Sequence, residues 1–590
     1  MNNPEHLEHL RHSAAHLLAA AVLELYPDAK LTLGPAIESG FYYDIDFSAQ
    51  GGSASGGNDS ISVEDLPAIE KKMKDLVNDW KEFTHREVSP EEAKEIYKGN
   101  EYKLEMIHDI AEKGEKITLY TCGNFTDLCR GGHVEEPRKM LRAFKLMSIA
   151  GAYWRGDEKN AMLTRIYGTA FETKEELKAH VDMLEEAKKR DHRKLGKELG
   201  LFVFSDLVGP GMPMYTPKGN IVRNAIVNFS RELNARVGFG EVHTPNMNKA
   251  DLFRTSGHYD KYKDDMLQVV SHYTDEEYYL KPMNCPQHTQ IYASEMRSYR
   301  DLPIRFADFA NLYRDEKPGE LSGLTRLRCF AQDDGHAFCR PDQIESEFKA
   351  ILEAIHIALR VYGMEYEVRL SLRDPQNKEK YLGDDAIWDK AESSLRQLLI
   401  SAGIEFREEL GEAAFYGPKM DIVARDSLRR EWQISTIQLD FNMPERFDLS
   451  YIDAEGNAQR PVMIHRALVG SPDRFMGIYI EHCAANFPVW MSPVQVHLVP
   501  VSEKHIDGAR ALAEEFRTAG IRISIDEADE TVGKKIRNAT KGKHPYILVV
   551  GDKELSGEDM MIRVRGQEEQ VTMSKEAFIE KVKKEIATRA

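Results

Sequence analysis

Three residues with metal-binding side chains, Cys285, His336 and His465, lie in widely separated segments that each read as a strand or strand end. The segments are YLKPMNCPQHTQI, RCFAQDDGHAFC and RPVMIHRAL. One thiolate and two imidazoles suit a borderline-soft ion such as zinc, and three ligands leave coordination positions open for water or substrate. Separations of this size require a tertiary fold, rather than a local zinc finger, to assemble the site. Spacing alone does not distinguish such a site from a buried thiol and two satisfied core imidazoles.

Length and composition indicate a multidomain globular protein of the cytoplasm. A chain of 590 residues exceeds the roughly 250–300 residues at which single cores stop growing. No apolar run approaches the roughly 20 residues of a membrane span, and the N-terminus lacks a secretion signal. Six cysteines fit a reducing compartment better than a disulfide framework. The net charge of −18 favours RNA binding only if basic residues are segregated onto one face.

The pattern of apolar residues and turn formers changes along the chain. Up to about residue 180, helical patterns such as RHSAAHLLAAAVLELY mix with strand patterns such as GFYYDIDF, and the Gly/Ser-rich stretch from Gln50 to Ser60 predicts a flexible loop. Residues 174–199 predict one continuous charged helix, whose basic cluster is either a solvated face or an RNA contact. Irregular alternation up to residue 493 favours an antiparallel sheet with packed helices, and regular alternation afterwards favours a small α/β domain.

A series of long motifs follows in order along nearly the whole chain: RHSAAHLL, FTDLCRGGH, GAYWRGD, DHRKLGKELGLF, KPMNCPQH, LYRDEKPGELSGLTRLRCFAQDDGHAFC, AFYGPKMDI, EWQISTIQLDF and VMIHRALVGSPDRFMGIYIEH. Together they resemble the class II aminoacyl-tRNA synthetases, and most closely the threonyl-tRNA synthetase family. The resemblance implies an α+β multidomain fold. Its parts would be an editing domain (1–180, α+β), a linker helix (181–199), a class II catalytic domain with an antiparallel sheet and helices (200–492), and an α/β anticodon-binding domain (493–590).

The same resemblance implies a function. Family members activate L-threonine with ATP, transfer it to the 3′ end of tRNA(Thr), and hydrolyse mischarged seryl-tRNA. We therefore expect a homodimer with one zinc ion per subunit and Mg²⁺ bound with ATP. The small ubiquitin-like domain that precedes the editing domain in many members is expected to be absent.

Activation of a carboxylate by ATP brings two anions together, so the site needs preorganised planar cations. By resemblance, Arg314 in NLYRDE clamps the α-phosphate and the amino-acid carboxylate, and Arg474 in GSPDRF lies near the γ-phosphate and the adenine. The implied catalytic residues are Arg314, Lys419 and Gln332. The remaining ATP-binding positions implied are Glu316, Arg326, Phe330 and Gln433.

Selection of threonine explains why a metal is expected. Valine is nearly isosteric with threonine, and an apolar pocket separates such pairs by only about 10²-fold. Zinc on Cys285, His336 and His465 would bind the amino group and the hydroxyl of threonine, and would so reject valine. The threonine-binding residues implied by the resemblance are Asp334, which accepts a hydrogen bond from the hydroxyl, with Gln332, Tyr416 and Met283.

Serine also carries the hydroxyl and differs by one methyl group, worth about 1–3 kcal/mol, so a second, editing site is expected. His12 and His16 are spaced i, i+4 on one helix face, and TDLCRGGH contains Asp127, Cys129 and His133. From spacing alone, these residues could form a second zinc site. The resemblance instead implies a metal-free site that hydrolyses seryl-tRNA. Gly132 stands where proline is usual in the family and gives this motif more backbone freedom.

In the C-terminal region, Asp529 in DEADET and Arg563 in MIRVRG match positions that meet anticodon bases in the family. Nearby basic residues would meet backbone phosphates or form a solvated surface; they are Lys534, Lys535, Arg537, Lys541 and Lys543.

Two other functional classes fit less well. An RNA-binding regulator that has lost catalysis would lack a motif arginine or a metal ligand, and all of these are present. A zinc hydrolase would need a general base of the HExxH kind, and the sequence contains no such motif.

Overall fold

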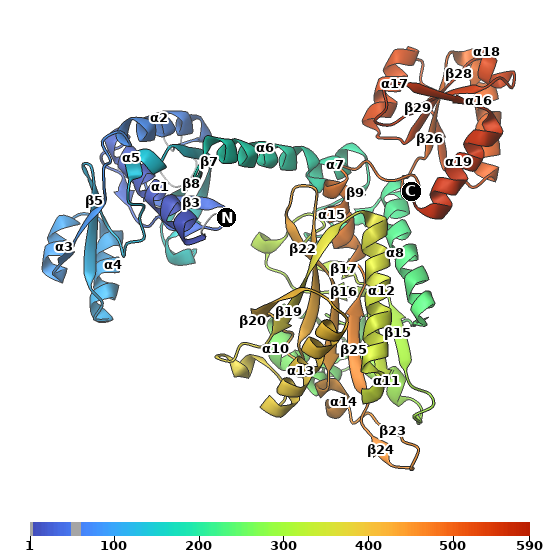
Figure 1. The fold of residues 1–590 in the computed structure, drawn as a ribbon, viewed down its shortest axis with the longest axis horizontal. Coiled ribbons are helices and arrows are strands. Elements are labelled where there is room, and N and C mark those ends of the chain that lie inside the picture. The colour runs from blue at the N-terminus through green and yellow to red at the C-terminus, as the bar shows by residue number, and fades with distance from the viewer. Residues whose placement is uncertain (1–3, 49–60) are drawn as a thin grey trace. The chain divides into compact units, whose positions relative to one another are not determined.

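The chain folds into two units, residues 1–186 and 187–590, each with its own hydrophobic core (Figure 1). The computed structural model describes residues 4–48 and 61–590, so the predicted loop from Gln50 to Ser60 lies outside the described residues. Within these ranges, no helix combines the length and the apolar character needed to cross a membrane.

The first unit is built around helix α1 (Pro4–Leu25), as the sequence predicts. Ala14, Leu17 and Ala21 recur at helical spacing and are fully buried where α1 packs on a sheet. That sheet is antiparallel and has the order β1-β3-β8-β7, with β2 paired to β3. Its strands are β1 (Lys30–Leu31), β2 (Ala36–Ile37), β3 (Gly40–Asp46), β7 (Ala143–Tyr153) and β8 (Met162–Phe171).

A second sheet in this unit carries the DLCRGGH motif. It is antiparallel and joins β4 (Thr84–Val88), β5 (Ile117–Cys122) and β6 (Phe125–Leu128). Asp127 lies in β6 and Cys129 directly follows it, so the motif begins where a strand ends. The other helices of this region are α2 (Leu66–Leu76), α3 (Pro90–Ile96), α4 (Glu101–Glu112), α5 (Pro137–Met140) and α6 (Lys174–Arg190).

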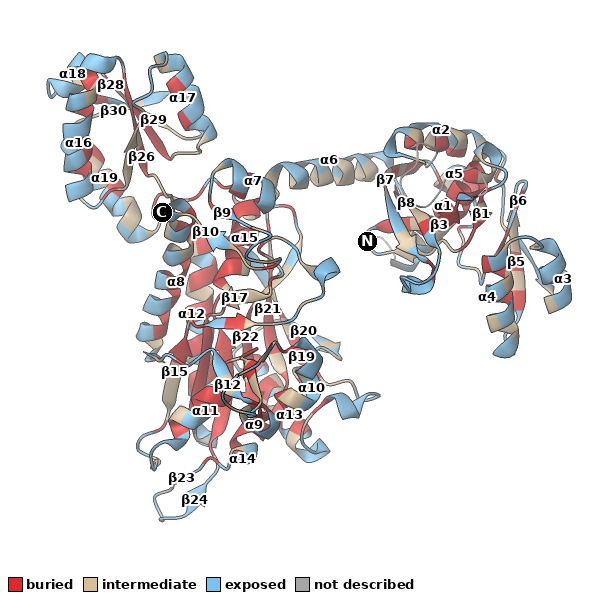
Figure 2. Ribbon diagram, turned by 180° about the vertical axis from the view of Figure 1, so that it is seen from behind, coloured by how far each residue is buried: buried red, intermediate tan, exposed pale blue. Residues whose placement is uncertain are grey.

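The second unit contains an eight-stranded sheet with the order β11-β15-β18-β25-β22-β21-β19-β20. The pairings are antiparallel except for the two outermost, β11 with β15 and β19 with β20, so the predicted antiparallel sheet is confirmed. Figure 2 shows burial concentrated on its central strands. The strands are β11 (Gly240–Glu241), β15 (Ile304–Asp308), β18 (Asp334–Cys339), β19 (Glu365–Leu372), β20 (Phe406–Leu410), β21 (Lys419–Arg425), β22 (Glu431–Asp440) and β25 (Val462–Ala467).

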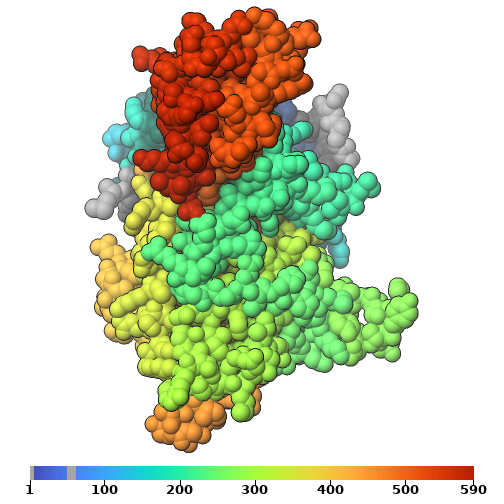
Figure 3. All heavy atoms as spheres, turned by 90° about the vertical axis from the view of Figure 1, so that its right-hand side faces the viewer, coloured from blue at the N-terminus to red at the C-terminus, as the bar shows by residue number. Residues whose placement is uncertain are grey.

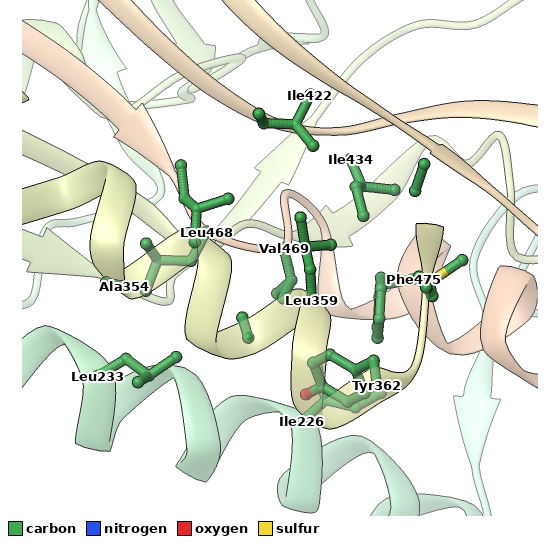
Figure 4. Close-up of a cluster of buried hydrophobic side chains, with 14 of the residues drawn as sticks. Ile226, Leu233, Ala354, Leu359, Tyr362, Ile422, Ile434, Leu468, Val469 and Phe475 are labelled. Atoms are coloured by element: carbon green, nitrogen blue, oxygen red, sulfur yellow. The ribbon is translucent and has the colours of Figure 1, made fainter. Parts of the chain in front are cut away.

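Helices α12 (Ile344–Tyr362) and α13 (Asp385–Ser401) pack on this sheet, and α8 (Pro217–Val237) packs on α12 and on α15 (Pro472–His482). Apolar side chains of α8 and α12, including Ile226 and Leu359, meet Ile434 of the sheet and Phe475 of α15 in one core (Figure 4). The opposite side of α8, in green, lies on the surface that faces the viewer in Figure 3. This packing fixes α15, which carries Arg474, against the sheet.

The remaining elements of this part of the chain are shorter. They are α7 (His192–Glu198), β9 (Phe202–Val203), β10 (Met214–Tyr215), β12 (Met247–Lys249), α9 (Ala250–Ser256), α10 (His258–Tyr262), β13 (Gln268–Val269), β14 (Tyr278–Leu280), α11 (Cys285–Ala293), β16 (Asn311–Tyr313), β17 (Cys329–Ala331), α14 (Asn442–Arg446), β23 (Tyr451–Ile452) and β24 (Ala458–Gln459).

The C-terminal part is the small α/β fold that the sequence predicts. Its sheet has the order β27-β26-β28-β29-β30, with β26 parallel to both β27 and β28. Its strands are β26 (Val496–Pro500), β27 (Ile523–Ile525), β28 (Tyr546–Val550), β29 (Met560–Val564) and β30 (Gln570–Met573). Its helices are α16 (Ile506–Thr518), α17 (Val532–Lys541), α18 (Asp552–Leu555) and α19 (Lys575–Thr588).

Two predictions of local structure are wrong. The predicted continuous helix over 174–199 is interrupted at Asp191, whose side chain accepts a hydrogen bond from the Arg193 N–H and so starts a new helix, α7. Cys285 does not lie in a strand. It is the first residue of α11, where Pro286 has its ring in the first turn and favours helix initiation.

Candidate functional site

Cys285, His336 and His465 come together in the second unit. His336 in β18 and His465 in β25 are direct partners in the antiparallel register, and α11 brings Cys285 to them. Their ligand atoms all lie within 4.8 Å of one another, and all three side chains are buried. The His336 Nε2 and the His465 Nδ1 face each other at 3.0 Å. The tertiary fold therefore assembles the predicted triad from three segments.

The other ring nitrogen of each histidine is already held. The His465 Nε2 lies 2.9 Å from the Asp440 carboxylate, and the His336 Nδ1 lies 2.7 Å from the Nδ1 of His288. Ring nitrogens fixed in this way leave the opposite nitrogens to a metal. Burial lowers the pKa of His336 well below its ordinary value, which keeps the imidazole neutral. These residues fit a metal ion, which would also deprotonate the buried Cys285 thiol, whose pKa burial raises.

The residues predicted to bind threonine surround the triad. Asp334 is buried, and its Oδ1 lies 3.7 Å from the His336 Nε2. The Tyr416 ring stacks on His465 with a centroid distance of 4.6 Å. Met283 packs in the same apolar cluster as Cys285 and Tyr416. Burial raises the pKa of the Asp334 carboxyl.

A cavity of about 490 Å³ opens beside the triad, and the predicted ATP-binding residues line it. The lining includes Arg314, Glu316, Arg326, Phe330, Gln332, Gln433 and Arg474. The antiparallel hairpin of β16 and β17 holds Arg314, whose backbone N–H donates to the Arg328 carbonyl at 2.9 Å. The Arg314 guanidinium lies over the Phe330 ring at 5.2 Å, and the Arg326 Nε donates to Glu316 at 2.8 Å.

Arg474 lies in the first turn of α15 and donates to the Gln433 carbonyl at 3.1 Å. Burial lowers the pKa of this guanidinium, because the charged form is held away from water. A buried cation in a cavity of this kind is favoured when an anion binds beside it. The cavity therefore suits a polyphosphate.

Lys419 is not a lining residue of this cavity. It lies in β21, where its Nζ is 3.1 Å from the Asp421 carboxylate and its register partner is Gln438 in β22. Gln438, which sequence reasoning missed, does line the cavity and accepts a hydrogen bond from the Tyr416 hydroxyl at 2.5 Å. It is also the register partner of His465, so it connects the cavity to the triad. A polar residue on the same face of the strand as Asp440 was the available signal.

A fully buried ion pair supports the segment between Gln332 and His336. The Asp333 carboxylate accepts from the Arg466 guanidinium at 2.6 Å, from the Ser230 hydroxyl at 2.9 Å and from the Leu468 N–H at 3.2 Å. Arg466 crosses directly over Gly335, where an added Cβ would lie 2.5 Å from the guanidinium carbon. The backbone between Asp333 and His336 is therefore held from both sides.

The first unit contains the second Cys/His cluster. The Cys129 Sγ lies 3.5 Å from the His12 Nε2 and 3.4 Å from the His133 Nε2, and the His16 and His133 rings are 4.6 Å apart. His12, His16, Asp127, Cys129 and Gly132 line a cavity of about 760 Å³. Burial lowers the pKa of His133 to about 2 and raises that of Cys129 to about 11. The cluster is therefore neutral near pH 7.

Sequence reasoning missed Lys103 and Tyr43 in this cavity. The Lys103 Nζ lies 2.6 Å from the Asp127 Oδ1, and the Tyr43 hydroxyl donates to the Asp127 Oδ2 at 2.5 Å. Lys103 is buried, although it is charged. It shares the apolar face of α4 with Ile107, and a lysine at such a position was the signal that could have identified it.

The two predicted anticodon residues lie apart in the C-terminal fold. Arg563 is in β29, and its Nε is buried with no hydrogen-bond partner among the described residues. Asp529 is exposed in the segment between β27 and α17. Within residues 61–590, no hydrogen bond or ion pair links these two side chains.

Three family models match the chain. Residues 117–167 match the threonyl and alanyl tRNA synthetase second additional domain, residues 268–483 match the tRNA synthetase class II core domain (G, H, P, S and T), and residues 495–585 match an anticodon binding domain.

Curated relatives align over the whole chain. A threonine–tRNA ligase of Rubrobacter xylanophilus is 48% identical over 591 residues, covering 100% of this chain and 90% of the relative. A threonine–tRNA ligase of Thermotoga neapolitana is 46% identical over 591 residues, with the same coverage. Among solved structures, the RNA binding domain of threonyl-tRNA synthetase from Cryptosporidium parvum is 38% identical with a TM-score of 0.64, covering 67% of this chain and 98% of that chain.

Proposed function

The chain belongs to the threonine–tRNA ligase family of class II aminoacyl-tRNA synthetases, and we propose that it activates L-threonine with ATP and transfers it to tRNA(Thr). One observation carries this proposal: Gln438 joins the cavity that contains the motif arginines to the Cys285–His336–His465 triad. A nucleotide and an amino acid would thus meet at one place.

In the first step, a threonine carboxylate oxygen attacks the α-phosphorus of ATP, and pyrophosphate leaves. Arg314 orients the carboxylate and the α-phosphate, and Arg474 holds the departing phosphates. Phe330 and Glu316 position the adenine, with Arg326 and Gln433 at the edges of the nucleotide. Gln332 orients the amino acid. Lys419 is the further proposed catalytic residue and lies in β21, next to the strand β22 that carries Gln438. In the second step, a hydroxyl of the terminal tRNA ribose attacks the adenylate carbonyl, and AMP leaves.

We propose that the triad binds zinc and that Mg²⁺ accompanies ATP. Zinc would supply open positions for the amino group and hydroxyl of threonine. Around it, Asp334 would accept a hydrogen bond from the substrate hydroxyl, Gln332 and Tyr416 would help to hold the amino group, and Met283 would complete the threonine pocket. The donor set and its fixed outer partners, Asp440 and His288, support this assignment.

We propose that the first unit hydrolyses seryl-tRNA without a metal. Neutral His12, His16 and His133 would position the water and the ester, with Cys129 nearby and the Asp127–Lys103 pair as the charged partner. The Asp127–Lys103 ion pair supports the metal-free assignment, because the carboxylate that could have held a ligand histidine is engaged by Lys103 instead.

The remaining assignments concern organisation and partners. We propose domains at 1–180, 181–199, 200–492 and 493–590, a homodimer, and a cytoplasmic location. Asp529 and Arg563 would contact anticodon bases, and the unpartnered buried Nε of Arg563 supports a ligand there.

The test of the proposed function is threonine-dependent exchange of pyrophosphate into ATP by the purified chain, with serine and valine as competitors. Strong exchange with threonine, weaker exchange with serine and little with valine is expected. Equal exchange with valine would contradict selection through the substrate hydroxyl, and absence of exchange would contradict the activity itself.

A further inference from the structure

His192, the first residue of α7, lies outside the ATP cavity and is buried, yet both of its ring nitrogens are hydrogen-bonded. The Nδ1 lies 2.6 Å from the Glu481 Oε1 in α15, and the Nε2 accepts from the Leu324 backbone N–H at 2.9 Å. One imidazole thus joins three segments: the start of α7, the end of α15 and the loop between β16 and β17.

These contacts determine the state of the ring. A backbone N–H can only donate, so the Nε2 must be unprotonated, and the Nδ1 then carries the proton that it donates to Glu481. The Glu481 carboxylate is itself held, because its Oε1 accepts from the His192 N–H at 3.0 Å and its Oε2 from Arg430 at 2.5 Å. Asp191, His192 and Glu481 are close enough to bind a cation, but both imidazole nitrogens are already engaged. The ring is fixed as the neutral Nδ1–H tautomer.

The loop that His192 holds contributes to the ATP cavity. Leu324 is fully buried and lines the cavity together with the next two residues, Thr325 and Arg326. Ser322 and Arg326 exchange backbone hydrogen bonds at 3.2 and 3.3 Å, which closes the loop tip into a tight turn around Leu324. The side chain of Arg326 is half exposed and pairs with Glu316 and Glu320, so its position depends on these carboxylates and on the backbone of this turn.

Gly323 shows how closely the ring and the loop fit. Its φ of +49° lies in the left-handed region, and an added Cβ would lie 2.1 Å from the His192 Nε2. Gly477 of α15 borders the ring from another side, where a Cβ would lie 3.5 Å from the His192 Cδ2. The loop tip therefore packs closely against the His192 ring, which in turn packs against α15.

We propose that His192 is a positioning residue for ATP: by accepting the Leu324 N–H, it holds the loop tip 322–326 in the conformation that presents Thr325 and Arg326 to the nucleotide. This inference rests on the proposed function, since it assumes that the cavity binds ATP. Because His192 also begins α7, the linker from the first unit and the nucleotide loop share one hydrogen-bonded residue.

Two substitutions separate the two hydrogen bonds. In His192→Gln, the amide oxygen can occupy the place of the Nε2 and accept from Leu324; in His192→Asn, the shorter amide can reach Glu481 only. Loss of one buried hydrogen bond corresponds to about a tenfold change in binding. We expect His192→Asn to raise the KM for ATP about tenfold in pyrophosphate exchange, with little change in the KM for threonine. His192→Gln should restore the parental KM for ATP.

A second measurement does not depend on activity. Mg²⁺–ATP should raise the Tm of the parent and of His192→Gln more than that of His192→Asn. The matched control is His505→Asn in the C-terminal fold, which also removes a buried imidazole bonded on both sides, to Ser502 and Asp552. This variant should keep the parental KM for ATP.

Unchanged ATP parameters in His192→Asn would overturn the inference, as would equal losses for ATP and threonine without rescue by glutamine. The proposed function fails separately, through absence of threonine-dependent exchange in the parent. In that case the ATP-dependent Tm shifts still decide the role of His192.

Discussion

The two Cys/His clusters contain the same residue types and differ in the hydrogen-bond partners of their histidines. In the second unit, Asp440 and His288 hold the outer nitrogens of the two histidines, and the inner nitrogens face each other at 3.0 Å on paired strands. In the first unit, the His16 Nδ1 is buried and has no hydrogen-bond partner among the residues that the structure describes, and the nearby carboxylate of Asp127 bonds to Lys103 and Tyr43.

This difference teaches that ligand identity alone does not define a metal site. A histidine binds a metal well when an outer acceptor fixes its tautomer and direction. The triad has such acceptors. In the first cluster, the carboxylate of Asp127 bonds to Lys103 rather than to a histidine, and the cluster lines a cavity of about 760 Å³. Similar side chains therefore favour metal binding in one place and water chemistry in the other.

The largest expected effect comes from Cys285→Ala. Removal of a ligand should abolish stoichiometric zinc binding and threonine activation together, a loss greater than the roughly 10–100-fold typical of outer partners. Metal analysis and pyrophosphate exchange on the same preparation measure both. Full activity without zinc would show that the triad does not need a metal, and the proposed difference between the two clusters would be wrong.

Arg314→Lys should reduce activation by roughly 10²–10³-fold, because a point charge cannot bridge carboxylate and phosphate as a planar fork does. Zinc content should stay at the parental level, which separates loss of nucleotide geometry from loss of the metal. Near-parental exchange in this variant would contradict the role of Arg314.

The double change His12→Ala and His16→Ala should slow deacylation of preformed seryl-tRNA by on the order of 10²-fold and leave threonine activation unchanged. A chelator should not affect deacylation by the parent. Loss of parental deacylation on chelation, with recovery on added zinc, would instead show that the first cluster also uses a metal ion.

Asp440→Asn should weaken zinc binding by about 10–100-fold. The new amide would still accept the Asn442 and Met443 N–H groups through one oxygen, but its NH₂ would face the His465 Nε2 and favour the tautomer with a protonated Nδ1. Asp127→Asn is the matched change in the first unit and should leave zinc content unchanged. A fall in zinc content in Asp127→Asn would indicate a metal there.

The smallest expected effect is that of pH on deacylation. Burial lowers the pKa of His16 well below its ordinary value and that of His133 to about 2, so both rings stay neutral as the pH falls from 8 to 6. A histidine with an ordinary pKa near 6.5 would lose most of its basic form over this range. After subtraction of uncatalysed hydrolysis, the rate should change by less than about twofold. A decline that follows a pKa near 6.5 would show that a histidine there titrates normally.

Arg314 and Arg474 could be singled out from the sequence because they lie in motifs of the family that it resembles, and both line one cavity, while their roles stay predictions. The α/β character of the C-terminal part and the antiparallel central sheet were likewise readable from the alternation of patterns. Alternation along the strand could have marked Gln438 and Asp440 as polar residues of one face, but their partners, and that of His288, arise from strand register and helix placement, which one sequence does not specify.

The start of α7 shows the same limit at the level of local structure. Charge and helical periodicity over 174–199 favoured one helix, but Asp191 caps a new one and Glu481 accepts the His192 N–H. A partner that lies far along the chain decided this boundary. Similarly, Lys103 was assigned no role, because its partner Asp127 is on a separate strand.

The buried pair of Asp333 and Arg466 restricts the order in which this protein can change by mutation. A side chain at Gly335 would displace the Arg466 guanidinium and with it the bond to Asp333. That change would leave the Asp333 carboxylate buried without its counter-ion, at a cost of about 3–5 kcal/mol. Position 335 is therefore epistatic with positions 333 and 466: a side chain there requires prior replacement of the ion pair, and single-step variation at this point of the sheet should be rare among functional variants.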